Sequence, residues 1–529
     1  MKKESYGYGF KIGHILLSLN FLNIWCFIIF MVLGSCSQKP KQQIKAQNAK
    51  PNVVFILADD LGYGDLKCYN PESKIPTPHL DKLASEGMRF TDAHTPASLC
   101  TPTRYGLLTG QYAWCSPLKK GVLQSYDLEL IADSVETIAK VFQEGGFETA
   151  HIGKWHLGYD WKVKEGYPTT WPINGIWRAD DRDERIDLSK GIKGGPLNAG
   201  FDYSYGFDCP NMPPYCFWEN GKIIGEAPSM IKPDTLYGNT GWFQKGWKLE
   251  EVHPAIEKRA LSYLDEVGKK GKPFFLYLSL TSPHVPLYPT DEAKGKSEAG
   301  DYGDFVVDVD NLVGKVQAQL EAIGLAENTI VVFTSDNGSP ARVEDPKKGE
   351  PYHKGSGEVI KQFGHKANGN FRGLKGDTWE GGHRVPMIVR WPGKVVASSV
   401  NDQLVCLTDW MGLAYTLTGN KKPANQGIDS YDLTETLKNV QEPVRGQMVH
   451  HSGSGKFAIR KGNWKLILQK GGDKYSAFFD PKGHETRFDG QLYNLEDDAM
   501  ERHNVYNEYP EKVEELTQLL AEIKNKGNH

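Results

Sequence analysis

The sequence shows no internal repeats, no low-complexity tract and little excess of either charge. Its 529 residues carry a formal net charge of −4 at pH 7, and 24% of them are charged. A protein with this balance has no general attraction to nucleic acid or to an anionic membrane surface. Nucleic acid is therefore not an expected partner, and an anionic ligand would need a local cluster of cations.

Cysteine is scarce, with 8 residues in the chain. Cys26 and Cys36 fall in an N-terminal apolar segment, and Cys100 belongs to a separate motif. The others are Cys68, Cys115, Cys209, Cys216 and Cys406. Their number is odd, so the sequence implies no complete disulfide framework. Cys209 and Cys216 flank a short loop that a disulfide could close in an oxidising compartment, but free thiols are favoured.

Only one hydrophobic run is long, extending over residues 12–33. Lysines at positions 2, 3 and 11 precede it, as in an export signal, and its length alone would also suit a membrane span. It ends in Leu33-Gly34-Ser35-Cys36, which resembles a bacterial lipobox. Such a signal is cut before the cysteine, whose thiol is then attached to lipid. An uncleaved anchor helix is the alternative.

Residues 1–36 are therefore expected to be a lipoprotein signal peptide with its lipobox, and residues 37–50 a flexible tether. The mature protein would be anchored to a bacterial membrane by lipid and would lie outside the cytoplasm. The acidic residues that often follow the lipidated cysteine of surface-exported lipoproteins are missing after Ser37. A periplasm-facing location is therefore expected rather than the cell surface.

Beyond the tether, apolar strands alternate with amphipathic helices. Continuous apolar runs predict strands at residues 52–57, 147–152, 274–280, 329–334 and 385–390, the last of which contains Pro386. Spaced apolar residues predict helices at 135–144 and 305–320. This alternation predicts an α/β fold in which helices sandwich a large, mostly parallel mixed sheet, over a catalytic domain of residues 51–420.

Two regions differ from this pattern. Residues 159–250 lose the periodicity and contain Trp161, Trp171, Trp177, Trp218, Trp242 and Trp247. They form either loops held to the core by aromatic packing or a substrate rim whose indole rings stack on sugars. Residues 421–529 are expected to form a smaller antiparallel α+β subdomain, with strands in 457–468 and 491–495 and a helix over 513–523.

The segment Cys100-Thr101-Pro102-Thr103-Arg104 predicts a helix that begins at a reactive residue. Pro102 suits the first turn, where its missing N–H costs nothing. Arg104 lies one turn beyond Cys100, and Gly110 ends the helix. Free N–H groups at a helix start favour an anion, and an arginine adds a bidentate donor for a tetrahedral oxyanion. The sequence thus predicts an anionic substrate.

Side chains with oxygen ligands follow two of the predicted strands. Asp59 and Asp60 come after the first strand, and Asp336 and Asn337 after the strand at 329–334. Carboxyl ends of parallel strands meet at one edge of a sheet, so these side chains are expected to lie together. An all-oxygen set suits a hard cation rather than zinc. A helix cap or turn would explain the first pair alone, but the second pair favours a metal site.

The same edge is expected to gather Lys154, His156 and His284, each of which follows a strand. Histidine titrates near neutral pH and suits proton transfer, whereas an isolated histidine usually has only a structural role. The position of both histidines after strand ends favours a functional role.

Together these motifs resemble those of the formylglycine-dependent (type I) sulfatases of the alkaline phosphatase superfamily, in particular bacterial glycan sulfatases and arylsulfatases. The string Cys-x-Pro-x-Arg-x-x-Leu-Leu-Thr-Gly at 100–110 is similar to the family's first signature, although Thr103 stands where relatives more often have serine. Further family motifs recur in order: Asp59-Asp60, Gly153-Lys154-Trp155-His156-Leu157-Gly158, Ser282-Pro283-His284, Ser335-Asp336-Asn337-Gly338 and Gly373-Leu374-Lys375-Gly376.

The resemblance implies a sulfuric ester hydrolase that acts on a sulfated saccharide. A maturation enzyme would oxidise Cys100 to formylglycine, whose hydrate would attack sulfur and form a covalent sulfo-enzyme intermediate. The resemblance also implies Ca²⁺. Its ligands would be Asp59, Asp60, Asp336, Asn337 and the modified Cys100.

Further roles follow from the resemblance. Lys154 and Lys375 would donate to the sulfate oxygens, beside Arg104. His284 would protonate the leaving alcohol, and His156 would act as the base. The substrate would be bound by Lys154, His284, Lys375 and His383, the last touching the sugar that carries the sulfate. The expected sugar is galactose or N-acetylgalactosamine.

Two other functions remain open. One is a phosphatase or phosphonate monoester hydrolase of the same superfamily, because the two oxyanions have similar geometry. A nucleophile derived from cysteine beside calcium favours the sulfate ester, whereas two zinc ions with serine or threonine would favour phosphate. The other is a catalytically dead glycan-binding lipoprotein. The complete set Cys100, Arg104, Lys154, His156, His284 and Lys375 argues against that loss.

Overall fold

The computed structural model describes residues 50–173, 182–233, 238–343, 357–440, 442–473 and 488–526. The expected signal peptide, the lipobox with Cys36 and nearly all of the tether lie outside these residues, as does Trp177. Residues 50–529 belong to one compact unit of the chain. Within the described ranges, no helix combines the length and the apolar character needed to cross a bilayer.

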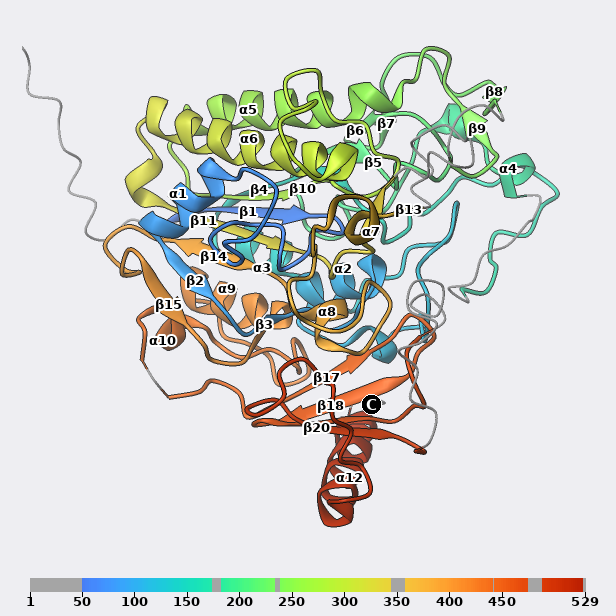
Figure 1. Ribbon diagram of the computed structural model, residues 1–529. Coiled ribbons are helices and arrows are strands. Elements are labelled where there is room, and N and C mark those ends of the chain that lie inside the picture. Colours follow the sequence, from blue (N-terminus) through green and yellow to red (C-terminus); the bar gives the residue numbers. More distant parts are fainter. Residues whose placement is uncertain are drawn as a thin grey trace, which may run out of the picture. The chain divides into compact units, whose positions relative to one another are not determined.

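A large mixed sheet forms the centre of this unit, with its described strands in the order β15-β2-β14-β11-β1-β10-β4-β5-β6-β7 (Figure 1). The middle strands are parallel: β11 (Thr329–Ser335), β1 (Asn52–Ala58), β10 (Phe274–Ser279), β4 (Glu148–Lys154) and β5 (Tyr203–Phe207). They are flanked by β14 (Met387–Arg390), β2 (Met88–Phe90), β15 (Ser399–Asn401), β6 (Trp218–Glu219) and β7 (Lys222–Ile223). β14 runs antiparallel to β11, so the sheet is mixed.

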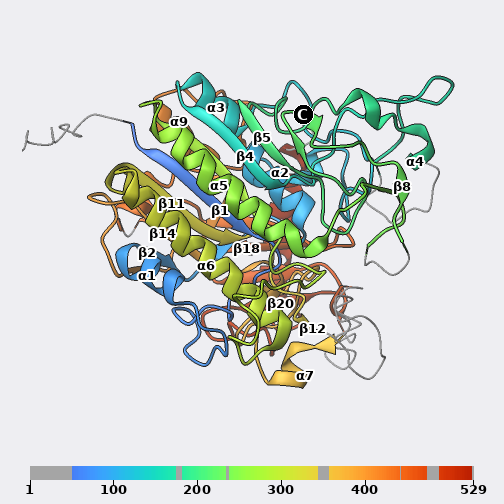
Figure 2. The ribbon, with the colours of Figure 1, turned by 90° about the horizontal axis from the view of Figure 1, so that it is seen from above.

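Helices cover both faces of this sheet (Figures 1 and 2). One group contains α1 (Pro78–Glu86), α5 (Val252–Gly268) and α6 (Gly300–Ala322), and the other α2 (Cys100–Thr109), α3 (Ile138–Glu144) and α9 (Trp410–Thr418). Central strand residues such as Val54, Ile56 and Leu278 are completely buried, as strands covered on both faces must be. The predicted α/β sandwich is confirmed.

The C-terminal region adds a separate antiparallel sheet in the order β17 (Gln447–His451), β18 (Phe457–Lys461), β19 (Trp464–Ile467) and β20 (Gln491–Asn494). Helix α12 (Pro510–Lys526) packs on it through Leu516 and Leu520. The segment predicted as one strand-like stretch at 457–468 is a hairpin. Its turn passes through Gly462, whose φ of 55° favours glycine.

Short elements complete the described part of the chain. β3 (Ala93–His94) pairs with β16 (Val405–Cys406), β8 (Met230–Ile231) with β9 (Trp242–Phe243), and β12 (Arg342–Val343) with β13 (Gly357–Glu358). The short helices are α4 (Arg182–Arg185), α7 (Val359–Phe363), α8 (Glu380–His383) and α10 (Thr434–Leu437). Cys209 and Cys216 are free thiols in this structure.

The region 159–250 is more ordered than its sequence predicts, because β5 adds a parallel strand to the central sheet beside β4. Its interior Gly206 has a φ of 154°, and a Cβ there would lie 1.9 Å from the Gly153 carbonyl oxygen. Trp161, Trp218 and Trp247 are buried in the core rather than displayed on a rim. Trp171 and Trp242 are partly buried and pack against the same core. Of the two interpretations, that of loops held to the core by aromatic packing therefore applies to these five tryptophans.

Candidate active site

The predicted site residues meet where the parallel strands end. Asp59 and Asp60 follow β1, Lys154 is the last residue of β4, and Asp336 follows β11. The chain turns sharply here: Asp60 has a φ of 68°, a conformation that aspartate tolerates better than most residues. Its backbone N–H donates to Asp336 Oδ1 at 3.1 Å, which joins the two strand ends.

Helix α2 places Cys100 at this edge. Leu99 is extended, the helix begins at Cys100, and Gly110 closes it in the left-handed conformation with a φ of 63°. Cys100 is 3% exposed and lies in the first turn, where backbone N–H groups lack helical partners. The start and end of the helix predicted from the sequence are confirmed.

Arg104 connects this helix to the carboxylates. Its Nη2 and Nε atoms donate to Asp336 Oδ2 at 2.7 and 3.1 Å, and Nη2 lies 3.7 Å from Asp59 Oδ1. A third nitrogen, Nη1, donates to the hydroxyl of Ser279 at the end of β10. The guanidinium thus fixes the relative positions of three strand ends and supplies a buried positive charge.

The arrangement fits a divalent cation. Ligand atoms of Asp59, Cys100 and Asp336 all lie within 4.8 Å of one another, as do those of Asp59, Asp60 and His284. Among the described residues, the buried Asp59 Oδ1 and Asn337 Oδ1 accept no hydrogen bond. A buried oxygen that accepts no hydrogen bond is costly, so Asp59 Oδ1 and Asn337 Oδ1 are candidate ligands for a cation.

Asn337 is oriented for this role by its amide nitrogen, which donates to Asp60 Oδ1 at 2.7 Å and to the Gly338 carbonyl at 3.0 Å. The amide oxygen is therefore directed away from these acceptors and left free. An asparagine held in this way presents a neutral oxygen ligand, which limits the negative charge of the site.

Two lysines compensate the carboxylates. Lys154 Nζ lies 2.7 Å from Asp59 Oδ2, and Lys375 Nζ lies 2.6 Å from Asp60 Oδ1. Burial disfavours both ammonium groups, but the neighbouring carboxylates outweigh it and raise the pKa of Lys154 and of Lys375. Both lysines are charged at neutral pH and are positioned beside Cys100, whose side chain carries the reacting atom in the predicted chemistry.

His156 presents one free ring nitrogen. Its Nε2 lies 3.1 Å from the Leu123 carbonyl oxygen, which can only accept, so Nε2 carries the proton. The Nδ1 atom is buried and has no partner among the described residues. Burial, reinforced by the charges of Lys154 and Arg104, holds the pKa of His156 well below its usual value. The ring is thus neutral, with a lone pair available at Nδ1.

His284 has the complementary orientation. Its Nδ1 faces the Val285 carbonyl oxygen, and Nε2 lies 3.7 Å from Asp60 Oδ2. Burial and the charge of Lys375 hold the pKa of His284 well below its usual value. His284 therefore lies beside Asp60 as a neutral ring, and it must gain a proton on Nε2 before it can act as an acid.

Asp208 belongs to this centre although sequence reasoning missed it. It directly follows β5, and its Oδ1 accepts the backbone N–H of His156 at 3.1 Å. His156 has a φ of 57°, so this bond holds a backbone conformation that few residues adopt freely. Burial raises the pKa of Asp208 to about 7. Asp208 follows a strand end like the other site residues, so recognising β5 would have revealed it.

A second missed residue, Asp65, ties the loops behind the site together. Its carboxylate accepts from the Gly62 backbone and the Tyr302 hydroxyl at 2.7 and 2.5 Å, and it lies 2.7 Å from His365 Nε2. The Tyr302 oxygen also lies 2.8 Å from the hydroxyl of Ser339, two residues beyond Asn337, which can donate to it. Asp65 thus braces the segments that follow β1 and β11.

His383 does not lie with the groups described above. It is completely buried, its Nδ1 lies 3.0 Å from His94 Nδ1, and its ring stacks on His450 with centroids 3.6 Å apart. Its Nε2 is 3.1 Å from Lys465 Nζ of the C-terminal sheet. With both ring nitrogens engaged inside the protein, His383 is not presented to a sugar as the sequence analysis expected.

Comparisons with known proteins agree with this geometry. The sulfatase family profile matches residues 51–420. The chain is 31% identical to an N-acetylgalactosamine-6-O-sulfatase of Bacteroides thetaiotaomicron, over 94% of this chain and 97% of that protein. It is 31% identical to arylsulfatase G of Mus musculus, over 90% and 88% of the two chains.

A solved sulfatase structure from glycosaminoglycan metabolism in Bacteroides thetaiotaomicron superposes with a TM-score of 0.75 at 29% identity, covering 90% of this chain and 100% of that one. The family profile covers well over half of the chain, and its span contains every residue that the geometry brings together at the strand ends. The chain therefore belongs to the sulfatase family, as a type I sulfatase of the alkaline phosphatase superfamily and a sulfuric ester hydrolase.

Proposed function

We propose that this protein removes a 6-linked sulfate from a galactose-type sugar, most specifically N-acetylgalactosamine, with a nucleophile derived from Cys100. The observation that carries the proposed chemistry is the position of Cys100 at the start of α2, with its Sγ within 4.8 Å of carboxylate oxygens of Asp59 and Asp336. The names of its relatives support the sugar and the position of the ester.

An unmodified thiol is poorly suited to this task. Burial raises the pKa of Cys100, and Asp336 and Asp59 oppose its ionisation as well, although Lys154 and Lys375 favour it. The thiolate is the reactive form of cysteine, so the unmodified residue is a weak nucleophile here. Oxidation of this side chain to formylglycine would supply a hydrated aldehyde whose hydroxyl attacks sulfur.

The neighbouring residues bind and orient the ester. Lys154 and Lys375 donate to the sulfate oxygens, where charge changes during transfer. Arg104 holds Asp336 and the end of α2 in place through its paired hydrogen bonds. Because these donors are fixed before substrate binds, little reorganisation is needed in the transition state.

Two histidines carry out the proposed proton transfers, one as the base and the other as the acid. The free Nδ1 of His156 accepts a proton, because Nε2 is committed to the Leu123 carbonyl. His284 donates from Nε2 to the leaving sugar oxygen after gaining a proton, which a bound sulfate anion would favour. Asp208 positions His156 through its backbone N–H.

Calcium is the proposed metal, held by Asp59, Asp60, Asp336, Asn337 and the modified side chain of Cys100. The protein ligands are oxygens, and two of them, Asp59 Oδ1 and Asn337 Oδ1, accept no hydrogen bond from the described residues. Hard oxygen ligands of this kind favour Ca²⁺ over zinc. Bound there, the cation would neutralise the sulfate and orient the nucleophile.

The proposed cellular context follows from the N-terminal sequence. Leu33-Gly34-Ser35-Cys36 supports cleavage before Cys36 and lipid attachment, which would tether the enzyme outside the cytoplasm, facing the periplasm. A formylglycine-generating maturation enzyme would be a transient partner. Cys36→Ser is expected to prevent lipid labelling, and removal of the protein from intact cells by protease would instead place it on the cell surface.

The decisive experiment joins mass spectrometry with substrate profiling. Protein made together with a maturation enzyme should show formylglycine in the peptide that contains Cys100, whereas Cys100→Ala should be inactive and Cys115→Ala, at a partly buried thiol in η1 (Ala113–Cys115), fully active. Activity of protein with only unmodified Cys100 would disprove the mechanism.

Substrate profiling would compare sulfated N-acetylgalactosamine, galactose, N-acetylglucosamine and uronic-acid saccharides with an aryl sulfate and a phosphate monoester. Preference for N-acetylgalactosamine 6-sulfate is expected. Preference for glucosamine sulfate would overturn the sugar assignment, best turnover of the aryl sulfate would overturn a glycan substrate, and best turnover of the phosphate ester would favour a phosphatase.

A further inference from the structure

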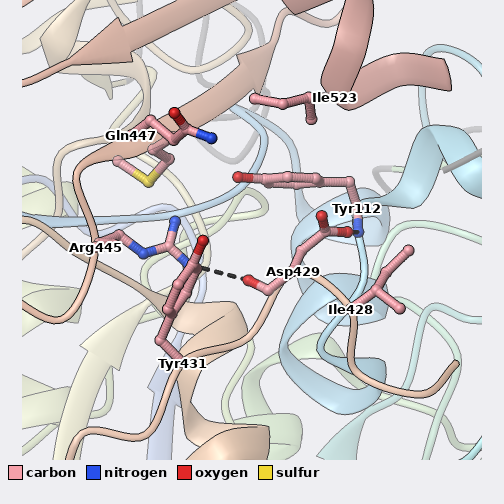
Figure 3. A pocket seen from close by; sticks show the side chains of 8 residues that line it. Tyr112, Ile428, Asp429, Tyr431, Arg445, Gln447 and Ile523 are labelled. Atoms are coloured by element: carbon pink, nitrogen blue, oxygen red, sulfur yellow. Dashed lines mark hydrogen bonds between the residues drawn. The ribbon is translucent and has the colours of Figure 1, made fainter. Parts of the chain in front are cut away.

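A cavity of about 320 Å³ has no lining residue among those placed at the catalytic centre (Figure 3). It is lined by Tyr112, Ile428, Asp429, Tyr431, Arg445, Gln447, Met448 and Ile523. These residues come from the segment after α2, the loop after α9, the approach to and the start of β17, and the end of α12. Ligand pockets usually measure about 300–1,000 Å³, so this cavity suits a single small ring.

Arg445 supplies the first sign of a ligand. Its side chain is almost completely buried, and its Nη2 donates to Asp409 Oδ1 at 2.5 Å and to the Asp429 carbonyl at 3.0 Å. The buried Nε has no hydrogen-bond partner in the described part of the chain. An unsatisfied N–H on a buried guanidinium is costly, and Figure 3 shows this group at the cavity wall between Gln447 and Tyr431.

Three further polar groups on the cavity wall have unused hydrogen-bonding capacity within the described part of the chain. Asp429 accepts the Tyr112 backbone N–H through Oδ2, which leaves Oδ1 without a donor among the described residues. The Tyr112 hydroxyl accepts from the Val449 backbone at 3.1 Å and retains its own hydrogen. The Gln447 side chain makes no hydrogen bond within the described ranges, and Figure 3 shows the Tyr112 hydroxyl directed toward it.

The charge of the cavity disfavours a strong anion. The Arg445 guanidinium is already paired with Asp409, and Asp429 adds a second carboxyl group. Burial raises the pKa of Asp429 to about 6, so this carboxyl is mainly ionised at neutral pH and acts as an acceptor. A sulfate or phosphate would meet this negative charge with no uncompensated cation on the described wall.

The remaining walls are apolar and aromatic. Arg445 stacks over one face of Tyr431, with 4.8 Å from the guanidinium carbon to the ring centroid, and Tyr431 is 41% exposed. Ile428, Met448 and Ile523 form other parts of the surface. An apolar ligand would contact these walls but would leave Asp429 Oδ1 and the Gln447 amide unpaired.

We propose that this cavity binds one neutral sugar residue, distinct from the sugar at the catalytic centre. Each sugar hydroxyl both donates and accepts, so adjacent hydroxyls can donate to Asp429 Oδ1 and accept from Arg445 or Gln447. The C–H faces of the ring pack on the tyrosines and the aliphatic walls. The choice of N-acetylgalactosamine as the first probe rests on the proposed function. The proposal that a neutral sugar binds in this cavity does not depend on it.

The test is ligand-observed NMR on the mature full-length enzyme, titrated with N-acetylgalactosamine, galactose, N-acetylglucosamine and fucose. Tyr431→Ala and Gln447→Ala are each expected to weaken binding about tenfold, the effect of removing one packed or hydrogen-bonded group. Tyr509→Ala, at a tyrosine of similar exposure on the C-terminal helix side, should change nothing. Turnover of a sulfated monosaccharide should be unchanged in all three variants.

Binding at the catalytic centre is distinguished with Lys375→Ala, which should lose turnover but keep this neutral-sugar binding. Loss of binding in Lys375→Ala, or full binding in a Tyr431→Ala/Gln447→Ala double variant, would overturn the proposal. The proposal would also be overturned if no neutral sugar bound. It would be overturned as well if inorganic sulfate bound in this cavity and displaced the sugar. Each result stands whether or not the enzyme acts on N-acetylgalactosamine sulfate.

Discussion

Lys154 Nζ lies 2.7 Å from Asp59 Oδ2, and both side chains are completely buried at the edge of the central sheet. Two charges in such a place stabilise one another only while both are present. The pair therefore links the stability of the fold to the position of Lys154, the cation that we propose binds sulfate.

We expect Lys154→Met to abolish turnover and to lower the free energy of unfolding by about 3 to 5 kcal/mol, because it leaves a buried carboxylate without its partner. Lys294→Met is the matched control: Lys294 Nζ also lies 2.7 Å from a carboxylate, that of Asp291, but both side chains are largely exposed. Its loss should cost less than about 1 kcal/mol. Urea unfolding measures both, and equal losses would contradict the role of burial.

Removal of the metal should destabilise the folded protein. Chelation is expected to lower the melting temperature, and added Ca²⁺ to restore it, because a cation that binds only the folded state stabilises it by linkage. Asn337→Ala should raise the Ca²⁺ concentration needed for restoration, whereas Asn370→Ala, at an exposed side chain, should not. Restoration by zinc alone, or no response to chelation, would reject an oxygen-ligated calcium site.

Asp208 should act on catalysis through His156. Asp208→Ala removes the acceptor for the His156 backbone N–H, and we expect a loss of at least about tenfold in kcat because misplacement of a catalytic group is costly. Asp208→Asn keeps an acceptor oxygen and should recover most of the rate. A fall in kcat with little change in KM is expected, and equal effects of both variants would show that the hydrogen bond is not the cause.

His383 should contribute to stability rather than to substrate affinity. His383→Ala breaks the contacts with His94, His450 and Lys465, and we expect a loss of about 2 to 4 kcal/mol in the free energy of unfolding. KM for the sulfated sugar should stay unchanged in the folded fraction. His503→Ala, at an exposed ring, is the control. A raised KM with unaltered stability would restore His383 to the substrate site.

Acid should destabilise the protein partly through His451. Burial lowers the pKa of this ring to about 4, and it packs near Trp114 and Phe457. Between pH 6.5 and about 4 the unfolded chain binds a proton that the folded one excludes, so stability is lost as pH falls through this window. His451→Gln should reduce the loss of unfolding free energy between pH 6.5 and about 4 by up to about 3 kcal/mol.

The comparison uses unfolding free energies of both proteins at pH 7, 6, 5 and 4. Only their difference isolates His451, because buried carboxyl groups with raised pKa values, such as Asp310, act in the opposite direction. Identical slopes in the two proteins would contradict the assignment.

Much of the site was predictable because it depends on one rule of parallel sheets. Apolar runs located β1, β4, β10 and β11, and the polar residues after those strands therefore had to meet. The rule did not predict Asp208, because β5 is short and is interrupted by Gly206, which is needed for close contact with Gly153. The apolar pattern of β5 is too weak for the strand to be predicted, so the residue that follows it was not recognised as part of the site.

His383 shows a different limit. Its local sequence lies just after the Lys375 motif, which suggested a place beside the substrate. Its actual partners, His94, His450 and Lys465, are far away in the sequence and come from the interface with the C-terminal sheet. Local spacing contains no information about such contacts, so a satisfied core histidine cannot be told from a ligand.

The order of strands also has a consequence for synthesis of the chain. β1 is made first, yet its partners β10 and β11 begin at Phe274 and Thr329. More than half of the domain must leave the ribosome before either edge of this apolar strand is covered, and contacts of such long range form slowly. Shortened products that end before β10 should expose β1 on both edges and aggregate, so full-length chains would depend on chaperones during this interval.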